Sequence, residues 1–123
     1  MTATGWKLDS ACRELLLELF PPHWRDMIAD HVTLAGHTAK DAPLPTETKA
    51  TVIGHADDGE GLEALVVEIG GSAKRPDGSI FHITWSLDRA LGRKAVESNE
   101  LLTRDGWHPL AVPIEITIIP SRF

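Results

Sequence analysis

The 123-residue chain has a single cysteine, Cys12, so no disulfide can form within it, and a reducing, cytoplasmic setting is the default expectation. No apolar run approaches the roughly 20 residues that a membrane-spanning helix needs, and the N-terminus lacks the pattern of a signal peptide. Basic residues are outnumbered by acidic ones, 12 to 18, which gives a net charge of -6. This balance argues against holding nucleic acid or a membrane through bulk electrostatics, but it leaves room for a small basic pocket that binds one phosphate.

The spacings that are typical of metal sites are also missing. The chain has no HExxH, no HxH and no pair of cysteines, so we expect no metal and no other cofactor. Six histidines and 18 acidic residues could still assemble a site through the fold, which keeps a metal-dependent hydrolase open as an alternative.

One amphipathic helix and several strands are present. The helix begins after Asp9 or Ser10 and ends before a proline pair at 21–22, with apolar residues at i, i+3, i+4 and i+7, namely Cys12, Leu15, Leu16 and Leu19. A short helical turn is predicted at 98–102, and strands are predicted at 27–35, 49–56, 62–69, 80–88 and 111–119. Because strands outnumber helices, we expect a mainly antiparallel α+β fold in one domain over residues 1–123.

The strand at 80–88 contains FHITWSLD, in which apolar and polar residues alternate. Alternation of this kind is typical of a half-buried strand, with His82 and Thr84 on the polar face. The segment DHVTL repeats the pattern, with His31 and Thr33 at the same spacing. Two His-apolar-Thr-apolar segments on two predicted strands favour a shared function over two isolated surface histidines.

Two imidazoles and two hydroxyls suit displacement at phosphorus. Near neutral pH one imidazole can be neutral and the other protonated, so one accepts a proton from the nucleophile while the other donates one to the leaving oxygen. The hydroxyls of Thr33 and Thr84 can bind the non-bridging phosphate oxygens. His31 and His82 are therefore the predicted catalytic residues, and the near symmetry of the two segments leaves open which is the acid and which the base.

DHVTL and FHITWSL resemble the motif strands of the two-histidine phosphoesterases, which carry paired His-x-Thr/Ser motifs. The nearest likeness is to the cyclic phosphodiesterase domains of tRNA-ligase-type RNA repair proteins, from about residue 20 to the end, although only the two short motifs are specific. The resemblance implies a bilobal fold whose two motif strands face a central cleft. It also implies hydrolysis of a 2',3'-cyclic phosphate to a 2'-phosphate without a metal, with an RNA end or a cyclic nucleotide as the partner. Transfer RNA ends, other RNA, nucleotide and ADP-ribose cyclic phosphates stay open as substrates.

The remaining basic residues and histidines lie outside the two motifs. Lys74 and Arg75, in the polar loop at 70–79 just before the second motif, could steer a phosphate or simply be solvated. His37 could border the cleft, His23 is expected to pack beside Trp24 in a loop, and His55 and His108 are expected at the surface. A module that binds a nucleotide or RNA end without turnover is the other alternative to an enzyme. The sequence does not determine the oligomeric state.

Overall fold

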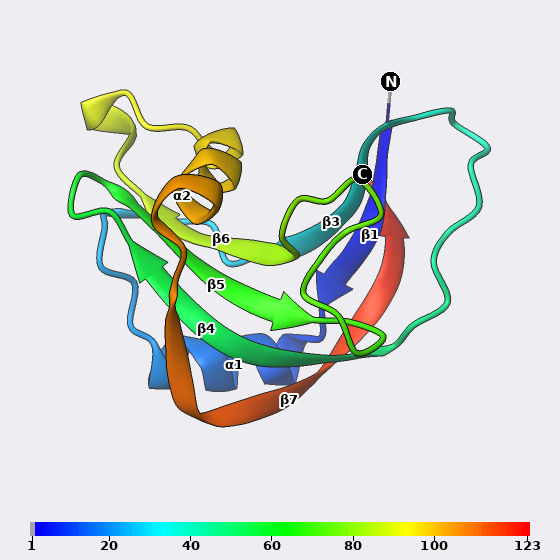
Figure 1. The fold of residues 1–123 in the computed structure, drawn as a ribbon, viewed down its shortest axis with the longest axis horizontal. Helices are drawn as coiled ribbons and strands as arrows, with labels where there is room; N and C mark the ends of the chain where they lie inside the picture. The colour runs from blue at the N-terminus through cyan, green and yellow to red at the C-terminus, as the bar shows by residue number, and fades with distance from the viewer. Residues whose placement is uncertain (1) are drawn as a thin grey trace.

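The computed structural model describes residues 2–123, which form seven strands, two α-helices and two short 3-10 helices (Figure 1). The strands are β1 (Thr2–Leu8), β2 (Asp26–Met27), β3 (His31–Thr38), β4 (Lys49–Asp57), β5 (Leu62–Glu68), β6 (His82–Leu87) and β7 (His108–Arg122). The helices are α1 (Ser10–Leu19), η1 (Arg89–Leu91), η2 (Ala95–Glu97) and α2 (Ser98–Asp105). No helix in this part of the chain is long and apolar enough to span a membrane.

Six strands close into a single antiparallel barrel. Their order is β6-β3-β1-β7-β4-β5, and β5 pairs back with β6, while the two-residue β2 adds to β6. The predicted mainly antiparallel α+β fold is therefore confirmed. The predicted division into two lobes is not confirmed, because the strands that carry the two His-Thr motifs, β3 and β6, are neighbours in the same closed sheet.

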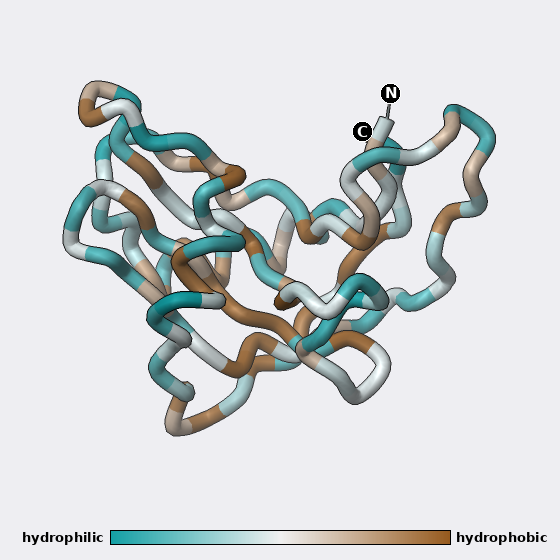
Figure 2. Tube along the Cα trace, turned by 45° about the horizontal axis from the view of Figure 1, so that its top comes forward, coloured by the Kyte–Doolittle hydropathy of each residue, from teal (hydrophilic) through white to brown (hydrophobic). Residues whose placement is uncertain are grey.

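The apolar side chains form two clusters. The larger one is built from strand residues of the barrel together with Leu16 of α1, and it includes Trp6, Val32, Ile83 and Trp85, each no more than 1% exposed. The smaller one joins Leu101 and Leu102 of α2 to buried residues of β4, β5 and β6, namely Ala56, Leu62, Val66 and Leu87. Figure 2 shows long apolar stretches along the strands in the middle of the molecule.

Helix α1 begins where the sequence predicts it. The carboxylate of Asp9 accepts a hydrogen bond from the backbone N–H of Cys12 and so caps the helix, which ends before the proline pair. Only part of the predicted apolar stripe is buried. Leu16 is fully buried, but Leu15 and Leu19 are about half exposed, and Leu17 and Phe20 pack against the core in their place.

The predicted strand at 27–35 is wrong at its start. Two strands, β2 and β3, occupy this region, and Ala29 lies between them with a φ of 43°. This left-handed conformation is costly for a residue with a Cβ atom, and it breaks the strand immediately before Asp30 and His31. The backbone N–H of Ala29 donates to the carbonyl of Thr84 on β6, which ties the break to the second motif strand.

Strand β1 was not predicted from the sequence, yet it pairs with β3 on one side and with β7 on the other. Gly5 explains how β1 approaches the first motif strand so closely. A Cβ atom at this position would overlap the carbonyl oxygen of Val32, so only glycine fits. β7 is likewise longer than predicted, and α2 extends the predicted turn at 98–102 to Asp105.

The alternation in FHITWSLD is interrupted in the structure. The pairing of β6 with β5 shifts register between Glu63 and Ala64, so that Glu63 lies opposite Ser86 and Ala64 opposite Thr84. Leu87 consequently packs in the smaller cluster, although Ile83 belongs to the larger one. The polar residues of β6 are not on an open face either: every residue of the strand is buried.

Candidate functional site: a cavity lined by both His-Thr motifs

The two His-Thr motifs lie side by side because β3 and β6 pair in antiparallel fashion, with Val32 opposite Ile83. This register puts His31 across from Thr84 and Thr33 across from His82. Val32 and Ile83 are fully buried in the core, so the four polar residues on either side of them face away from it. The two imidazoles are therefore diagonal neighbours, a relation in which the residues lie about 7–8 Å apart.

All four motif residues line one cavity of about 480 Å³. The cavity lies between the chain ends and the region of η2 and α2, which stand on opposite sides of β3 and β6 in Figure 1. Its other walls come from residues that the two motifs do not include, namely Ala3, Gly36, His37, Arg75, Asp77, Ala95, Val96, Asn99 and Phe123. His37 thus borders the cavity, which is one of the two positions considered for it.

His82 is held in a fixed orientation at the base of this cavity. It is 6% exposed, and its Nδ1 lies 2.8 Å from the carbonyl oxygen of Ile80. Because a carbonyl can only accept, Nδ1 carries the proton, and Nε2 keeps an unshared electron pair. Burial lowers the pKa of His82 to about 4, with smaller contributions in the same direction from Arg75 and His31. His82 is therefore neutral at pH 7.

His31 has a more exposed and more charged environment. Its side chain is 34% exposed, and its Nδ1 lies 3.1 Å from the Oδ2 atom of Asp30. Burial alone would raise the pKa of Asp30, but hydrogen bonds from Lys7 and His31 outweigh it and the pKa is lowered, so Asp30 is ionised at neutral pH. The ring of Phe123 packs against the imidazole with 4.5 Å between centroids. A carboxylate at Nδ1 orients the ring.

The two threonine hydroxyls are in different environments. The Oγ1 atom of Thr84 is buried, lying 2.9 Å from the hydroxyl of Ser98 on α2 and 3.3 Å from the carbonyl oxygen of Ala95. Thr33 is partly exposed, and its hydroxyl makes no hydrogen bond with any residue from 2 to 123. Thr33 can therefore bind a ligand without breaking a contact, whereas Thr84 is already part of a hydrogen-bonded wall.

The structure separates the two basic residues that the sequence grouped together. Arg75 lines the cavity, and its Nε is buried without a hydrogen-bond partner among residues 2–123. Burial lowers the pKa of its guanidinium, with Asp77 acting in the opposite direction. Lys74 is exposed and lies outside this cavity; it lines a neighbouring apolar cavity, whose wall Arg75 also forms. A buried cationic donor that lacks a partner is suited to binding an anion.

Asn99 is a site residue that the sequence did not indicate. Its Nδ2 donates to the carbonyl of Val96 at 3.1 Å, and its Oδ1 is buried without a partner among the described residues. The sequence around Asn99 gives no signal of this role. It predicts only a short turn at 98–102, and a turn of that length does not indicate which face of the longer helix α2 borders the cavity. Asn99 therefore adds a free acceptor to the cavity wall.

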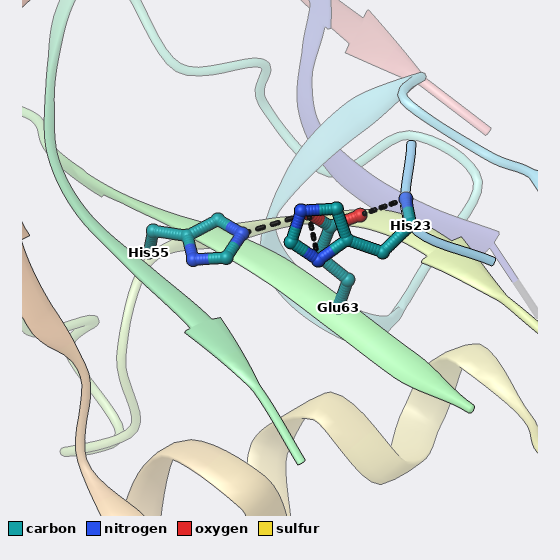
Figure 3. Close-up of side chains that lie close together, drawn as sticks. All are labelled: His23, His55 and Glu63. Atoms are coloured by element: carbon teal, nitrogen blue, oxygen red, sulfur yellow. Dashed lines mark hydrogen bonds and ion pairs between the residues drawn. The ribbon is translucent and has the colours of Figure 1, made fainter. Parts of the chain in front are cut away.

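Of the remaining histidines, His55 is not where the sequence put it, and His23 makes contacts that the sequence did not indicate. His55, predicted at the surface, is largely covered, and its Nε2 lies 2.7 Å from the Oε2 atom of Glu63, a carboxylate with no solvent exposure. His23 does lie in the loop beside Trp24, but its Nδ1 contacts Asp57 at 2.6 Å and Glu63 at 3.3 Å. These residues form a separate polar cluster (Figure 3). His108 is exposed, as predicted.

Comparison of the chain with models of protein families, with curated proteins and with solved structures gave no match.

Proposed function

We propose that the chain is a metal-independent cyclic phosphodiesterase that hydrolyses a 2',3'-cyclic phosphate to a 2'-phosphate, in the manner of the two-histidine phosphoesterases. One observation carries this proposal: His31, Thr33, His82 and Thr84 line a single cavity together with Arg75, whose buried Nε has no hydrogen-bond partner among residues 2–123. These groups match the needs of displacement at phosphorus, which are two proton-transfer groups and donors for a charged phosphate.

The hydrogen bonds of the two histidines suggest their roles. His82 has its proton on Nδ1, so Nε2 can accept a proton from the attacking water. His31, oriented by the carboxylate of Asp30, donates its proton to the 3'-oxygen as the bond from phosphorus to that oxygen breaks. The new bond to the water oxygen leaves a 2'-phosphate. The pKa of His82 is low for a base, and the negative charge of a bound phosphate would raise it toward the working pH.

Arg75 and Thr33 are the proposed phosphate ligands. Both line the cavity, and each has a donor that lacks a partner in the described chain. Thr84 can contribute only by exchanging its contact with Ala95 for one with the phosphate, while the hydroxyl of Ser98 keeps it in place. Lys74 is left to a secondary role, because it faces the neighbouring cavity.

That neighbouring cavity offers a place for the nucleoside. It has a volume of about 560 Å³, and its wall contains the aromatic rings of Trp6 and Phe81 and the side chain of Leu44. Because Arg75 lines both cavities, a nucleotide with its phosphate at Arg75 can extend its base into the apolar one. A net charge of -6 on the chain is compatible with such a small substrate, a cyclic nucleotide or the terminal residue of an RNA.

The direct test is hydrolysis of 2',3'-cyclic AMP by protein treated with EDTA, with the product identified as 2'-AMP by chromatography. His31→Asn and His82→Asn should each lower kcat about 10²–10⁴-fold, since each removes a proton-transfer group. The double variant should be little worse than either single variant, because the pair acts as a unit. His108→Asn, which changes an exposed histidine outside the cavity, is the matched control and should keep the parental rate.

Three results would contradict the proposal. Tight binding of the cyclic nucleotide without turnover would identify a binding module. Hydrolysis that EDTA abolishes and a divalent ion restores would identify a metal-dependent hydrolase. Hydrolysis at the parental rate by a folded His31→Asn, His82→Asn double variant would place the reaction elsewhere in the molecule.

A further inference from the structure

The polar cluster of His23, His55 and Glu63 is distinct from the cavity of the two motifs, and none of the three lines that cavity. The three residues come from different segments: His55 from β4, Glu63 from β5, and His23 from the loop between α1 and β2. In Figure 3 the two imidazoles point toward the same carboxylate. Nothing in the sequence spacing indicates this convergence. The pairing of β4 with β5 brings His55 to Glu63, and the backbone N–H of His23 donates to the same carboxylate.

Glu63 is held so that one of its oxygens is reserved for the two imidazoles. Its Oε1 accepts hydrogen bonds from the hydroxyl of Ser86 at 2.6 Å and from the backbone N–H of His23 at 3.0 Å. Its Oε2 lies 2.7 Å from the Nε2 atom of His55 and 3.3 Å from the Nδ1 atom of His23. A carboxylate that is fixed through one oxygen and presents the other beside two ring nitrogens has the orientation of a monodentate metal ligand.

The distances in this cluster suit a tetrahedral ion. Zinc bonds of about 2.0–2.1 Å to nitrogen or carboxylate oxygen put neighbouring ligand atoms about 3.3 Å apart. The three donor atoms all lie within 4.8 Å of one another. The distance from Oε2 to the Nδ1 atom of His23, 3.3 Å, equals the tetrahedral separation, and the distance to the Nε2 atom of His55, 2.7 Å, is shorter. Small side-chain rotations would therefore be enough to surround an ion.

The charges of the cluster also favour a cation. Glu63 is completely buried, and Asp57, whose Oδ2 lies 2.6 Å from the Nδ1 atom of His23, adds a second carboxylate. Among residues 2–123 neither carboxylate has an ion pair with lysine or arginine. The carboxylates of Asp57 and Glu63 thus have imidazoles as their only basic partners among these residues, and a bound cation would balance their negative charge.

We propose that His23, His55 and Glu63 bind a zinc-class divalent cation at this end of the barrel, separate from the two-histidine cavity. Each imidazole would give up the proton that it now donates to a carboxylate, because a metal binds the unprotonated nitrogen. His23 is half exposed, so water or the carboxylate of Asp57 can occupy the fourth coordination position of the ion, next to His23. The bound ion would fix the loop after α1 to β4 and β5.

The test uses the full chain without an affinity tag, freed of metal by a chelator and titrated with ZnCl₂ in a calorimeter. We expect one zinc ion per chain and, with Co²⁺ in place of Zn²⁺, the intense visible absorption of a tetrahedral site. His23→Gln and His55→Gln should each weaken zinc binding at least about 100-fold, since loss even of a group that only supports a ligand costs 10- to 100-fold. Zinc should also raise the melting temperature of the parent and not that of His23→Gln.

Histidine variants at the other cavity separate this site from adventitious binding. His31→Gln and His37→Gln remove imidazoles from the two-histidine cavity and should bind zinc as the parent does. Equal zinc affinity in the parent and in folded His23→Gln and His55→Gln would overturn the proposal. So would the absence of zinc binding by the parent, which would leave the cluster as a network that neutralises Glu63. Either result leaves the cyclic phosphodiesterase proposal unaffected, because that reaction is measured in EDTA.

Discussion

Burial of a neutral histidine at the base of the cavity should make the stability of the protein depend on pH. Burial lowers the pKa of His82 to about 4, compared with about 6.5 in an unfolded chain. Between these values the unfolded state binds a proton that the folded state does not. The stabilising contribution of His82 is therefore fully present above pH 6.5, and it is lost as the pH falls toward 4.

The magnitude follows from the two pKa values. Lowering the pH from 7.5 to 4.5 should reduce the free energy of unfolding by about 2–3 kcal/mol through this one group. The carboxylates of the protein also titrate in this range, so the quantity to measure is the difference in unfolding free energy between the parent and His82→Asn. The amide of the asparagine can still donate to the carbonyl of Ile80. The assay is urea unfolding followed by circular dichroism at half-unit pH intervals.

The control replaces an exposed histidine by the same residue. His108→Asn should lose stability with falling pH as the parent does, whereas the curve of His82→Asn should be flatter by about 2–3 kcal/mol over the same interval. Parallel curves for the parent and a folded His82→Asn would refute the reasoning. They would mean that residue 82 can be protonated in the folded state at little cost, and that the ring is not enclosed as the structure describes.

Three further outcomes are expected. The acid limb of the pH profile of kcat/KM should have an apparent pKa of about 4, set by His82 in the free enzyme, and a limb near 6.5 would contradict this assignment. Thr33→Val should lower kcat/KM about 10- to 150-fold at unchanged melting temperature, whereas Thr84→Val should also lower the melting temperature, because only Thr84 is hydrogen-bonded in the fold. Arg75→Met should raise KM and increase the free energy of unfolding by about 1 kcal/mol, since it removes a buried donor without a partner. Lys74→Met, in the wall of the neighbouring cavity, should raise KM less and leave the free energy of unfolding unchanged. A loss of stability in Arg75→Met would show that its guanidinium is satisfied in solution.

The four motif residues of the cavity wall could be predicted from the sequence because their placement depends on a local pattern. Each motif needs only that His and Thr alternate with an apolar residue on a strand, and Val32 and Ile83 are indeed fully buried while their polar neighbours line the cavity. The pairing of the two strands was not encoded in either motif. It depends on the register that puts Val32 opposite Ile83, which is a property of the whole barrel.

The features that could not be predicted from the sequence are those in which tertiary contacts override the local pattern of apolar and polar residues. Strand β1 has polar and small residues where alternation would require apolar ones, and its Gly5 is explained only by the approach of Val32. Ala29 gives no hint of a left-handed conformation, which the surrounding hydrogen bonds to Thr84 and Arg13 impose. His55 and Glu63 likewise belong to two different strands, and only the pairing of β4 with β5 brings their side chains together.

The interruption in β6 explains how one strand can contribute to two polar sites. With unbroken alternation, His82, Thr84 and Ser86 would all lie on one face, and Ser86 would extend the wall of the two-histidine cavity. The register shift puts Ser86 opposite Glu63 instead, where its hydroxyl holds the carboxylate at 2.6 Å. The same shift leaves Thr84 beside Ser98 at the cavity. A β-bulge of this kind bends its strand locally and redirects a side chain. The two sites can therefore change independently, because each depends on different side chains of β6.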